Sequence, residues 1–232
     1  GGNAPVIVMD DADLDVAVNS IVASRVINTG QVCNCAERVY VQSGIKDAFL
    51  DRLTEKMKAV QFGNSIAAAD AGTALDMGPM VNQAGVDSVA AKVAAAKANG
   101  ADVLCGGAEA SEVGHHYLPT VLANCTDDMS VMKDEIFGPV LPVRAVSDLE
   151  EAVALANDSP FGLTSSIFST NINTVMRACE KLRVGETYVN REHMEAFQGY
   201  HAGIRKSGLG GADGKHGLYE FTHTHVVYMQ RT

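Results

Sequence analysis

Residues 30–38, with the sequence GQVCNCAER, carry two cysteines separated by one residue, the side chains in this chain best suited to chemistry. Cys33 and Cys35 could supply a thiol nucleophile or two metal ligands. A structural zinc ion needs four ligands, and the sequence has no second Cys or His pair at matching spacing. Most lone cysteines in folded proteins are small buried hydrophobes. The pattern therefore leaves a nucleophilic thiol, an inert buried thiol and, in last place, a redox or metal module open.

Short apolar runs typical of buried strands alternate along the chain with segments whose apolar residues recur at helical spacing. These patterns predict the elements that must position the cysteines. The predicted strands are residues 5–9, 38–42, 103–105, 117–122, 140–146, 164–168 and 187–190. The predicted helices are residues 14–30, 45–63, 83–99, 149–157 and 172–182. Strands separated by helices indicate a mainly parallel sheet covered on both faces, which is a three-layer α/β domain. The thiol segment then joins a helix to a strand at the sheet's edge.

Residues 191–217 interrupt this alternation with seven glycines and clustered polar side chains. Long Gly-rich segments inside compact domains are usually functional loops. Residues 226–229 (VVYM) then predict a terminal strand, whose backbone groups need a partner strand.

Size and charge limit the classes of function. The 232 residues are 47% hydrophobic, which is enough to bury one large core. Acidic residues outnumber basic ones by 28 to 18 without a basic run, so nucleic acid and anionic membranes are not expected partners. The chain has five cysteines, an odd count that favours free thiols and a reducing compartment. It has neither a long apolar span nor a leader in which basic residues precede an apolar run, so we expect a cytoplasmic protein. The chain begins without an initiator methionine, and we expect it to be a fragment.

The thiol segment resembles the nucleophile motif of the aldehyde dehydrogenase family, with GQVC at residues 30–33 and Arg38 five positions on. Three further segments fit the family in the expected order: GGNAP at the start, EIFGPV at residues 135–140 and KSG at residues 206–208. The resemblance covers essentially the whole chain. Within the superfamily it is greatest for the bacterial lactaldehyde and glycolaldehyde dehydrogenase group.

The resemblance implies a covalent mechanism at Cys33. A Cys33 thiolate adds to the aldehyde, the thiohemiacetal passes hydride to NAD⁺, and water hydrolyses the thioester to a carboxylic acid. The developing oxyanion is stabilised by the Cys33 backbone N–H and by a family asparagine that this chain lacks. Cys35 is implied to be only a structural neighbour.

The resemblance also implies that essential parts lie upstream. In the family the general-base glutamate directly precedes the Gly-Gly pair, and the cofactor-binding domain precedes it in turn. We therefore expect the cofactor domain and the base to be missing from this chain, and the chain alone to be inactive. Preference for NAD over NADP is not fixed by these residues.

Glu135 and Phe137 match the family positions that hold the nicotinamide ribose and flank the nicotinamide ring. A carboxylate can accept hydrogen bonds from two adjacent hydroxyls, and an aromatic side chain supplies a flat apolar wall. The alternative is an exposed turn at Glu135 and core packing of Phe137.

The polar loop lines the aldehyde pocket in the family. Its hydrogen-bonding side chains favour a small hydroxyaldehyde, because a long apolar aldehyde would leave buried polar groups unpaired. Asn34, Glu195 and His201 are the expected substrate contacts. A solvated, charged loop is the alternative.

We expect a catalytic domain over residues 1–217 and a C-terminal segment, residues 218–232, whose strand joins a partner subunit in a homodimer or homotetramer. His223 stands where many relatives carry a second glutamate, and no role is assigned to it. Two readings stay open besides the hydrolytic enzyme: a relative that forms acyl-CoA or reduces an acyl phosphate, and a non-enzymatic homologue.

Overall fold

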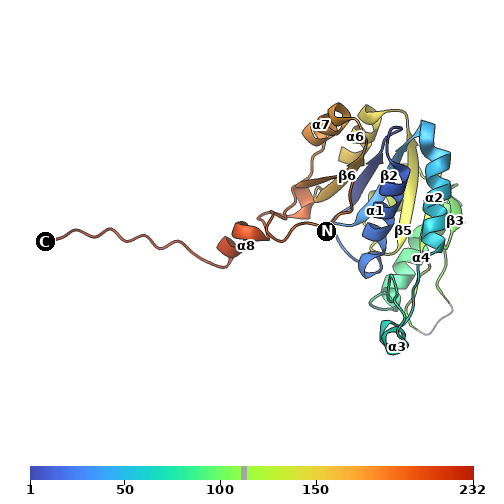
Figure 1. Cartoon of the computed structure of the whole chain (residues 1–232), viewed down its shortest axis with the longest axis horizontal. Coiled ribbons are helices and arrows are strands. Elements are labelled where there is room, and N and C mark those ends of the chain that lie inside the picture. The colour runs from blue at the N-terminus through green and yellow to red at the C-terminus, as the bar shows by residue number, and fades with distance from the viewer. Residues whose placement is uncertain (111–113) are drawn as a thin grey trace.

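A seven-stranded sheet with helices on both faces forms the centre of the molecule (Figure 1). The computed structural model describes residues 1–110 and 114–232. The strands are β1 (Ala4–Val8), β2 (Ala36–Gln42), β3 (Asp102–Cys105), β4 (Thr120–Ala123), β5 (Val140–Val146), β6 (Thr164–Phe168) and β7 (Glu186–Val189).

The strands lie in the order β3-β4-β5-β2-β1-β6-β7. Every neighbouring pair is parallel except β3 and β4, which are antiparallel. The predicted three-layer, mainly parallel α/β fold is therefore confirmed, with one antiparallel strand at an edge.

Two hydrophobic clusters cover the two faces of the sheet. The helices are α1 (Leu14–Val26), α2 (Lys46–Lys58), α3 (Ser65–Asp70), α4 (Gln83–Ala98), α5 (Ser130–Lys133), α6 (Leu149–Asn157), α7 (Ile172–Lys181) and α8 (Gly214–Glu220). Helices α1 and α2 pack into one cluster, and α4, α6 and α7 into the other. Successive strand residues point to opposite faces, so Val6 and Val8 join the first cluster while Ile7 joins the second.

The first helix ends earlier than its apolar period predicts. Helix α1 ends at Val26, and a short 3₁₀ turn, Ile27–Gly30, follows. Asn28, Thr29 and Gly30 all have positive φ angles of 45°, 59° and 72°, a left-handed conformation that cannot continue an α-helix. The chain thus turns sharply just before the thiol segment.

Three short helices, α3, α5 and α8, were not predicted, and the strand expected over residues 117–122 is β4, which begins at Thr120. Helix α8 runs across position 217, the predicted end of the catalytic domain, and that division stays a prediction.

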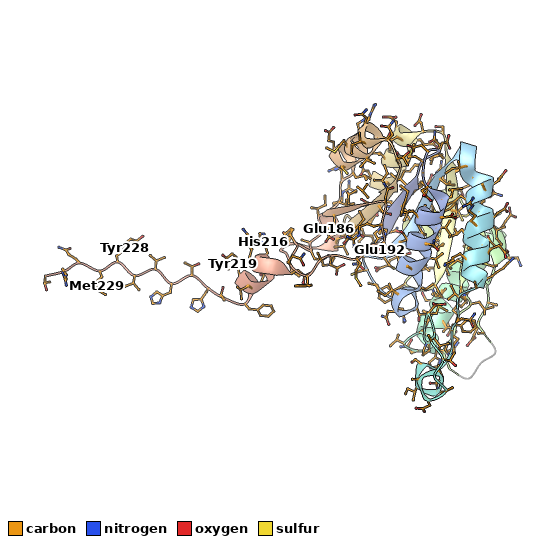
Figure 2. The ribbon with its side chains drawn as sticks, viewed as in Figure 1. Glu186, Glu192, His216, Tyr219, Tyr228 and Met229 are labelled. Carbon is orange, nitrogen blue, oxygen red and sulfur yellow. The ribbon has the colours of Figure 1, made fainter. Side chains whose placement is uncertain are left out.

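The C-terminal ten residues leave the body of the molecule as an extended tail (Figure 1). Residues 223–232 are exposed throughout, and the strand predicted at residues 226–229 has no partner within the described chain. Figure 2 shows Tyr228 and Met229 on this tail, well away from the sheet. Pairing of the tail with a second subunit stays a prediction.

None of the helices in the described residues has both the length and the apolar character needed to cross a membrane.

Candidate active site

Cys33 lies in the turn that connects the 3₁₀ segment to β2, where it is partly exposed. It lines a cavity of about 360 Å³ together with Gly1, Leu163 and His201. Gly1 precedes β1, Cys33 precedes β2, and Leu163 precedes β6, so the cavity opens at the amino ends of three neighbouring parallel strands. The fold thus brings a thiol, a histidine and the first residue of the chain to one opening.

Gly2 lies between Cys33 and Glu135. A Cβ atom on Gly2 would stand 1.9 Å from the Cys33 carbonyl oxygen, so only glycine fits at this position. The Gly2 amide donates a hydrogen bond of 3.0 Å to Glu135 Oε1. The sequence motifs that begin the chain and surround Cys33 and Glu135 therefore meet in space, although 133 positions separate Gly2 from Glu135.

Glu135 and Phe137 lie on the segment that leads into β5, also at the amino end of a strand. Glu135 is half-buried, and Lys92 Nζ donates to its backbone carbonyl at 2.6 Å. Phe137 is 42% exposed, which is unusual for a large aromatic residue, and its φ angle is 58°. The alternative, in which Phe137 packs into the core, does not agree with this exposure.

Cys35 is less accessible than Cys33, which is partly exposed. Cys35 is fully buried, and its thiol donates to the Val32 carbonyl over 2.9 Å. Burial raises the pKa of the Cys35 thiol to about 11, so it stays protonated at neutral pH. The structure thus supports the prediction that Cys35 is a structural neighbour.

Asn34 and Glu195 are brought together across 161 positions of sequence. Asn34 Nδ2 donates to Glu195 Oε2 at 2.6 Å, while the Asn34 carbonyl accepts from Thr164 Oγ1. Neither residue lines the Cys33 cavity, so the structure pairs two of the three predicted substrate contacts with one another beside the thiol turn.

His201, the third predicted substrate contact, is held by two residues that the sequence did not single out. His201 Nδ1 lies 2.5 Å from Glu186 Oε1, and Tyr188 donates its hydroxyl to Glu186 Oε2 at 2.5 Å. A histidine held through Nδ1 by a carboxylate has a fixed ring orientation, which leaves Nε2 for other partners. The alternation of Glu186 and Tyr188 on one face of β7 is the one sequence signal that could have grouped them.

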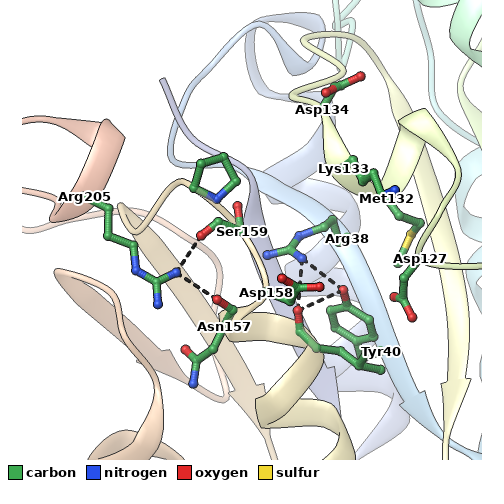
Figure 3. A pocket seen from close by; sticks show the side chains of 12 residues that line it. Arg38, Tyr40, Asp127, Met132, Lys133, Asp134, Asn157, Asp158, Ser159 and Arg205 are labelled. Atoms are coloured by element: carbon green, nitrogen blue, oxygen red, sulfur yellow. Dashed lines mark hydrogen bonds between the residues drawn. The ribbon is translucent and has the colours of Figure 1, made fainter.

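A larger cavity of about 540 Å³ lies elsewhere (Figure 3), and its two arginines already have protein partners. Arg38 donates to the Ala156 carbonyl and to the Tyr40 hydroxyl, and Arg205 donates to the Asn157 and Ser159 carbonyls. These arginines bind the carbonyl groups at the end of α6 and in the turn after it. The cavity contains no thiol and belongs to the scaffold.

Among residues 1–110 and 114–232, no three Cys, His, Asp or Glu side chains gather closely enough to hold a metal ion. All five cysteines are free thiols.

Comparison with known proteins places this geometry among related enzymes. The model of the aldehyde dehydrogenase family matches residues 1–227. The lactaldehyde dehydrogenase of Escherichia coli (strain K12) is 57% identical over 230 residues, which are 99% of this chain and 47% of that protein. Its crystal structure superposes with a TM-score of 0.93 over 100% of this chain and 48% of its own.

The betaine aldehyde dehydrogenase of Staphylococcus aureus, solved in complex with NAD⁺, is 34% identical and superposes with a TM-score of 0.87 over 95% of this chain and 44% of its own. The chain spans about half the length of the relatives that it matches.

Proposed function

Because the chain belongs to the aldehyde dehydrogenase family, we propose that the complete protein oxidises a small hydroxyaldehyde, such as lactaldehyde or glycolaldehyde, to its carboxylic acid with NAD. Cys33 is the proposed nucleophile. The observation that carries the proposal is that Cys33, His201 and Gly1 line one cavity, with Glu135 hydrogen-bonded to the neighbouring Gly2.

The surroundings of Cys33 suit nucleophilic attack on a carbonyl carbon. Its thiolate adds to the aldehyde, and negative charge develops on the former carbonyl oxygen. Within the part of the chain that the structure describes, the Cys33 backbone N–H donates no hydrogen bond, so it is available to that oxygen. After hydride leaves, water attacks the Cys33 thioester, releases the carboxylic acid and restores the thiol.

A general base must activate that water. In the family it directly precedes the Gly-Gly pair, and Gly1 lines the Cys33 cavity here, so a residue before Gly1 would enter beside the thioester. We expect this base, and the domain that binds the rest of the cofactor, upstream of Gly1 in the complete protein.

Glu135 and Phe137 fit a nicotinamide nucleotide. The Glu135 carboxylate can accept from two adjacent ribose hydroxyls, and the exposed Phe137 ring offers an apolar wall beside it. Bound NAD⁺ would accept the hydride from the aldehyde carbon. Similar structures include one solved with NAD⁺ and one of an NADP-dependent enzyme from E. coli, which supports a nicotinamide cofactor.

The polar side chains beside the thiol support a hydroxyaldehyde. His201 faces the cavity and is oriented by Glu186, while the buried amide of Asn34 is paired with Glu195. A substrate hydroxyl can bond to the Nε2 atom of His201, which Glu186 leaves unoccupied, whereas a purely apolar aldehyde offers it no partner. The 57% identity to a lactaldehyde dehydrogenase supports the same substrate class. We further propose a cytoplasmic homo-oligomer joined through the C-terminal tail.

The test is NADH formation by the complete protein with glycolaldehyde, L-lactaldehyde and propanal, beside Cys33→Ala and Cys35→Ala. We expect turnover with both hydroxyaldehydes, less efficient turnover of propanal, and loss of activity only in Cys33→Ala. Turnover that needs coenzyme A or phosphate would indicate an acyl-transferring relative, and no turnover with any aldehyde would indicate a non-enzymatic homologue. A kcat/KM for propanal equal to that for the hydroxyaldehydes would contradict the proposed specificity for hydroxyaldehydes.

A further inference from the structure

Arg25 and Glu37 form an ion pair entirely beneath the surface, next to the thiol turn. Arg25 Nη1 lies 3.1 Å from Glu37 Oε1, and the two side chains are 0% and 1% exposed. Burying two charges costs free energy that their mutual attraction seldom exceeds, so such a pair needs further hydrogen bonds. Both side chains make these bonds to the backbone of the candidate active site.

Arg25 holds the two ends of the thiol turn. Its Nη1 donates to the Ala36 carbonyl at 2.5 Å, and its Nη2 donates to the Gly30 carbonyl at 2.7 Å. These two carbonyls lie on either side of Cys33 in the sequence. One planar guanidinium therefore fixes where the turn that carries the thiol begins and where it ends.

Glu37 holds the segment that carries the proposed cofactor contacts. Its Oε2 accepts from the Ile136 amide at 3.2 Å, and its Oε1 accepts from the Phe137 amide at 3.3 Å. Ile136 and Phe137 directly follow Glu135 in the sequence. Phe137 lies 100 positions from Glu37. The ion pair is thus a bridge between the thiol turn and the segment of residues 135–137.

We propose that Arg25 and Glu37 are positioning residues for hydride transfer, holding the Cys33 adduct at a fixed separation from the nicotinamide. This inference rests on the proposed function. In the step concerned, the C–H bond of the thiohemiacetal breaks and hydride reduces NAD⁺. The adduct's hydroxyl loses its proton to solvent as the thioester C=O forms. Transfer falls steeply with separation, and a displacement of about 1 Å can lower a rate by about 100-fold.

The direct test is Glu37→Gln in the complete protein, which keeps the size of the side chain and removes its charge. Glu151→Gln is the matched control, because Glu151 also accepts from a backbone amide, that of Ser147, and pairs with an arginine, Arg144, without touching the thiol turn. Three quantities are measured: single-turnover NADH formation with aldehyde carrying hydrogen or deuterium at C1, alkylation of Cys33 by iodoacetamide read by peptide mass spectrometry, and amide hydrogen exchange at Ile136 and Phe137.

We expect Glu37→Gln to slow NADH formation by about tenfold or more, to increase the deuterium effect and to speed exchange at both amides. Alkylation at Cys33 should stay within about twofold of the wild type, since it requires no cofactor, and Glu151→Gln should match the wild type throughout. A purely structural role would not separate hydride transfer from alkylation.

Unchanged NADH formation and exchange in folded Glu37→Gln, or an equal fall in alkylation and NADH formation, would overturn the inference. Should Glu37→Gln fail to fold, Glu37→Asp keeps the charge but shortens the reach to Ile136 and Phe137, and wild-type hydride transfer in that variant would overturn it as well. A wild-type protein that forms no NADH would overturn the proposed function, and the positioning role with it.

Discussion

At the scale of single residues, His193 in the polar loop is a buried ionisable side chain with a defined partner. His193 is 5% exposed, its Nδ1 lies 3.1 Å from Ser24 Oγ, and its ring packs against Tyr188. Ser24 Oγ also accepts from the Ala36 amide at the start of β2. The neutral imidazole therefore connects the polar loop, through Ser24, to the start of β2 beside the thiol turn.

Acid should weaken this contact. Burial, with a smaller contribution from the nearby Arg25 charge, lowers the pKa of His193 from 6.5 to about 3. The unfolded chain therefore binds the proton first, so the stability from neutral His193 is complete above pH 6.5 and is lost as the pH falls toward 3. At about pH 5 the loss is about 2 kcal/mol. Urea unfolding of wild type and His193→Asn at about pH 7.5 and 5 should show a flatter pH dependence in the variant.

His115→Asn is the control, because His115 is exposed and should leave the pH dependence unchanged. If His193→Asn loses stability as steeply between these pH values as the wild type, another ionisable group is responsible for the pH dependence.

A second prediction concerns the contact between Asn34 and Glu195. Glu195→Ala leaves the buried Asn34 amide without its partner at 2.6 Å, so binding of a hydroxyaldehyde should weaken. In the complete protein we expect KM for glycolaldehyde to rise about tenfold, with little change for propanal. Glu192→Ala is the control, since Glu192 pairs with the partly exposed Arg191 outside the site. Equal changes in KM for glycolaldehyde and propanal would show that Glu195 does not recognise the substrate hydroxyl.

At the scale of elements, much of the fold is predictable because each buried strand is a short run of β-branched residues and each long helix has an apolar period. Residues 5–9 and 140–146 are predicted within one position of β1 and β5. The short helices α3 and α8 are not, because six or seven residues rarely give a readable period. Nor does a local pattern show that β3 pairs antiparallel with β4, since that depends on the path between them.

The candidate site is predictable in its parts and not in its assembly. The thiol motif and the segment with Glu135 stand out in the sequence, whereas their meeting at Gly2 depends on the order of strands in the sheet. Ligand sites of open parallel sheets usually lie at the carboxyl ends of the strands. Here the thiol turn lies at the amino ends, so the general rule would have misplaced it. The contact of Glu186 with His201 and those of Arg25 with Gly30 and Ala36 depend on loops and could not be derived from spacing.

A prediction at this scale concerns the turn after α1. Gly30 has φ +72°, and a Cβ there would lie 2.3 Å from the Gly138 carbonyl oxygen. Gly72 has a similar φ of +68° with nothing within 4 Å. Gly72→Ala should therefore cost about 1 kcal/mol of unfolding free energy from the backbone alone, and Gly30→Ala about 3 kcal/mol or more. Urea unfolding measures both, and equal costs would show that the contact with Gly138 relaxes freely.

At the scale of the whole molecule, the tail beyond α8 contributes nothing visible to the fold of one chain. Residues 223–232 are all exposed, and none of their atoms forms a hydrogen bond with the rest of the described chain. An apolar run of Val226, Val227, Tyr228 and Met229 in water is costly unless it is covered.

Deleting residues 223–232 should therefore leave the melting temperature of the separated chain nearly unchanged and reduce the assembly seen by sedimentation. Deleting only residues 230–232 keeps the apolar run and should leave the assembly intact. A truncated chain that sediments like the wild type would exclude the tail as the contact between subunits.

The position of Gly1 has a practical consequence for anyone who produces this polypeptide. Gly1 lines the opening that also contains Cys33, and Gly2 has no room for even a methyl group beside the Cys33 carbonyl. A purification tag, protease scar or added methionine joined at Gly1 therefore begins beside this opening and close to the thiol. Handles for isolation or surface attachment are better placed after Thr232, because residues 230–232 are exposed and lie beyond the apolar run of the tail.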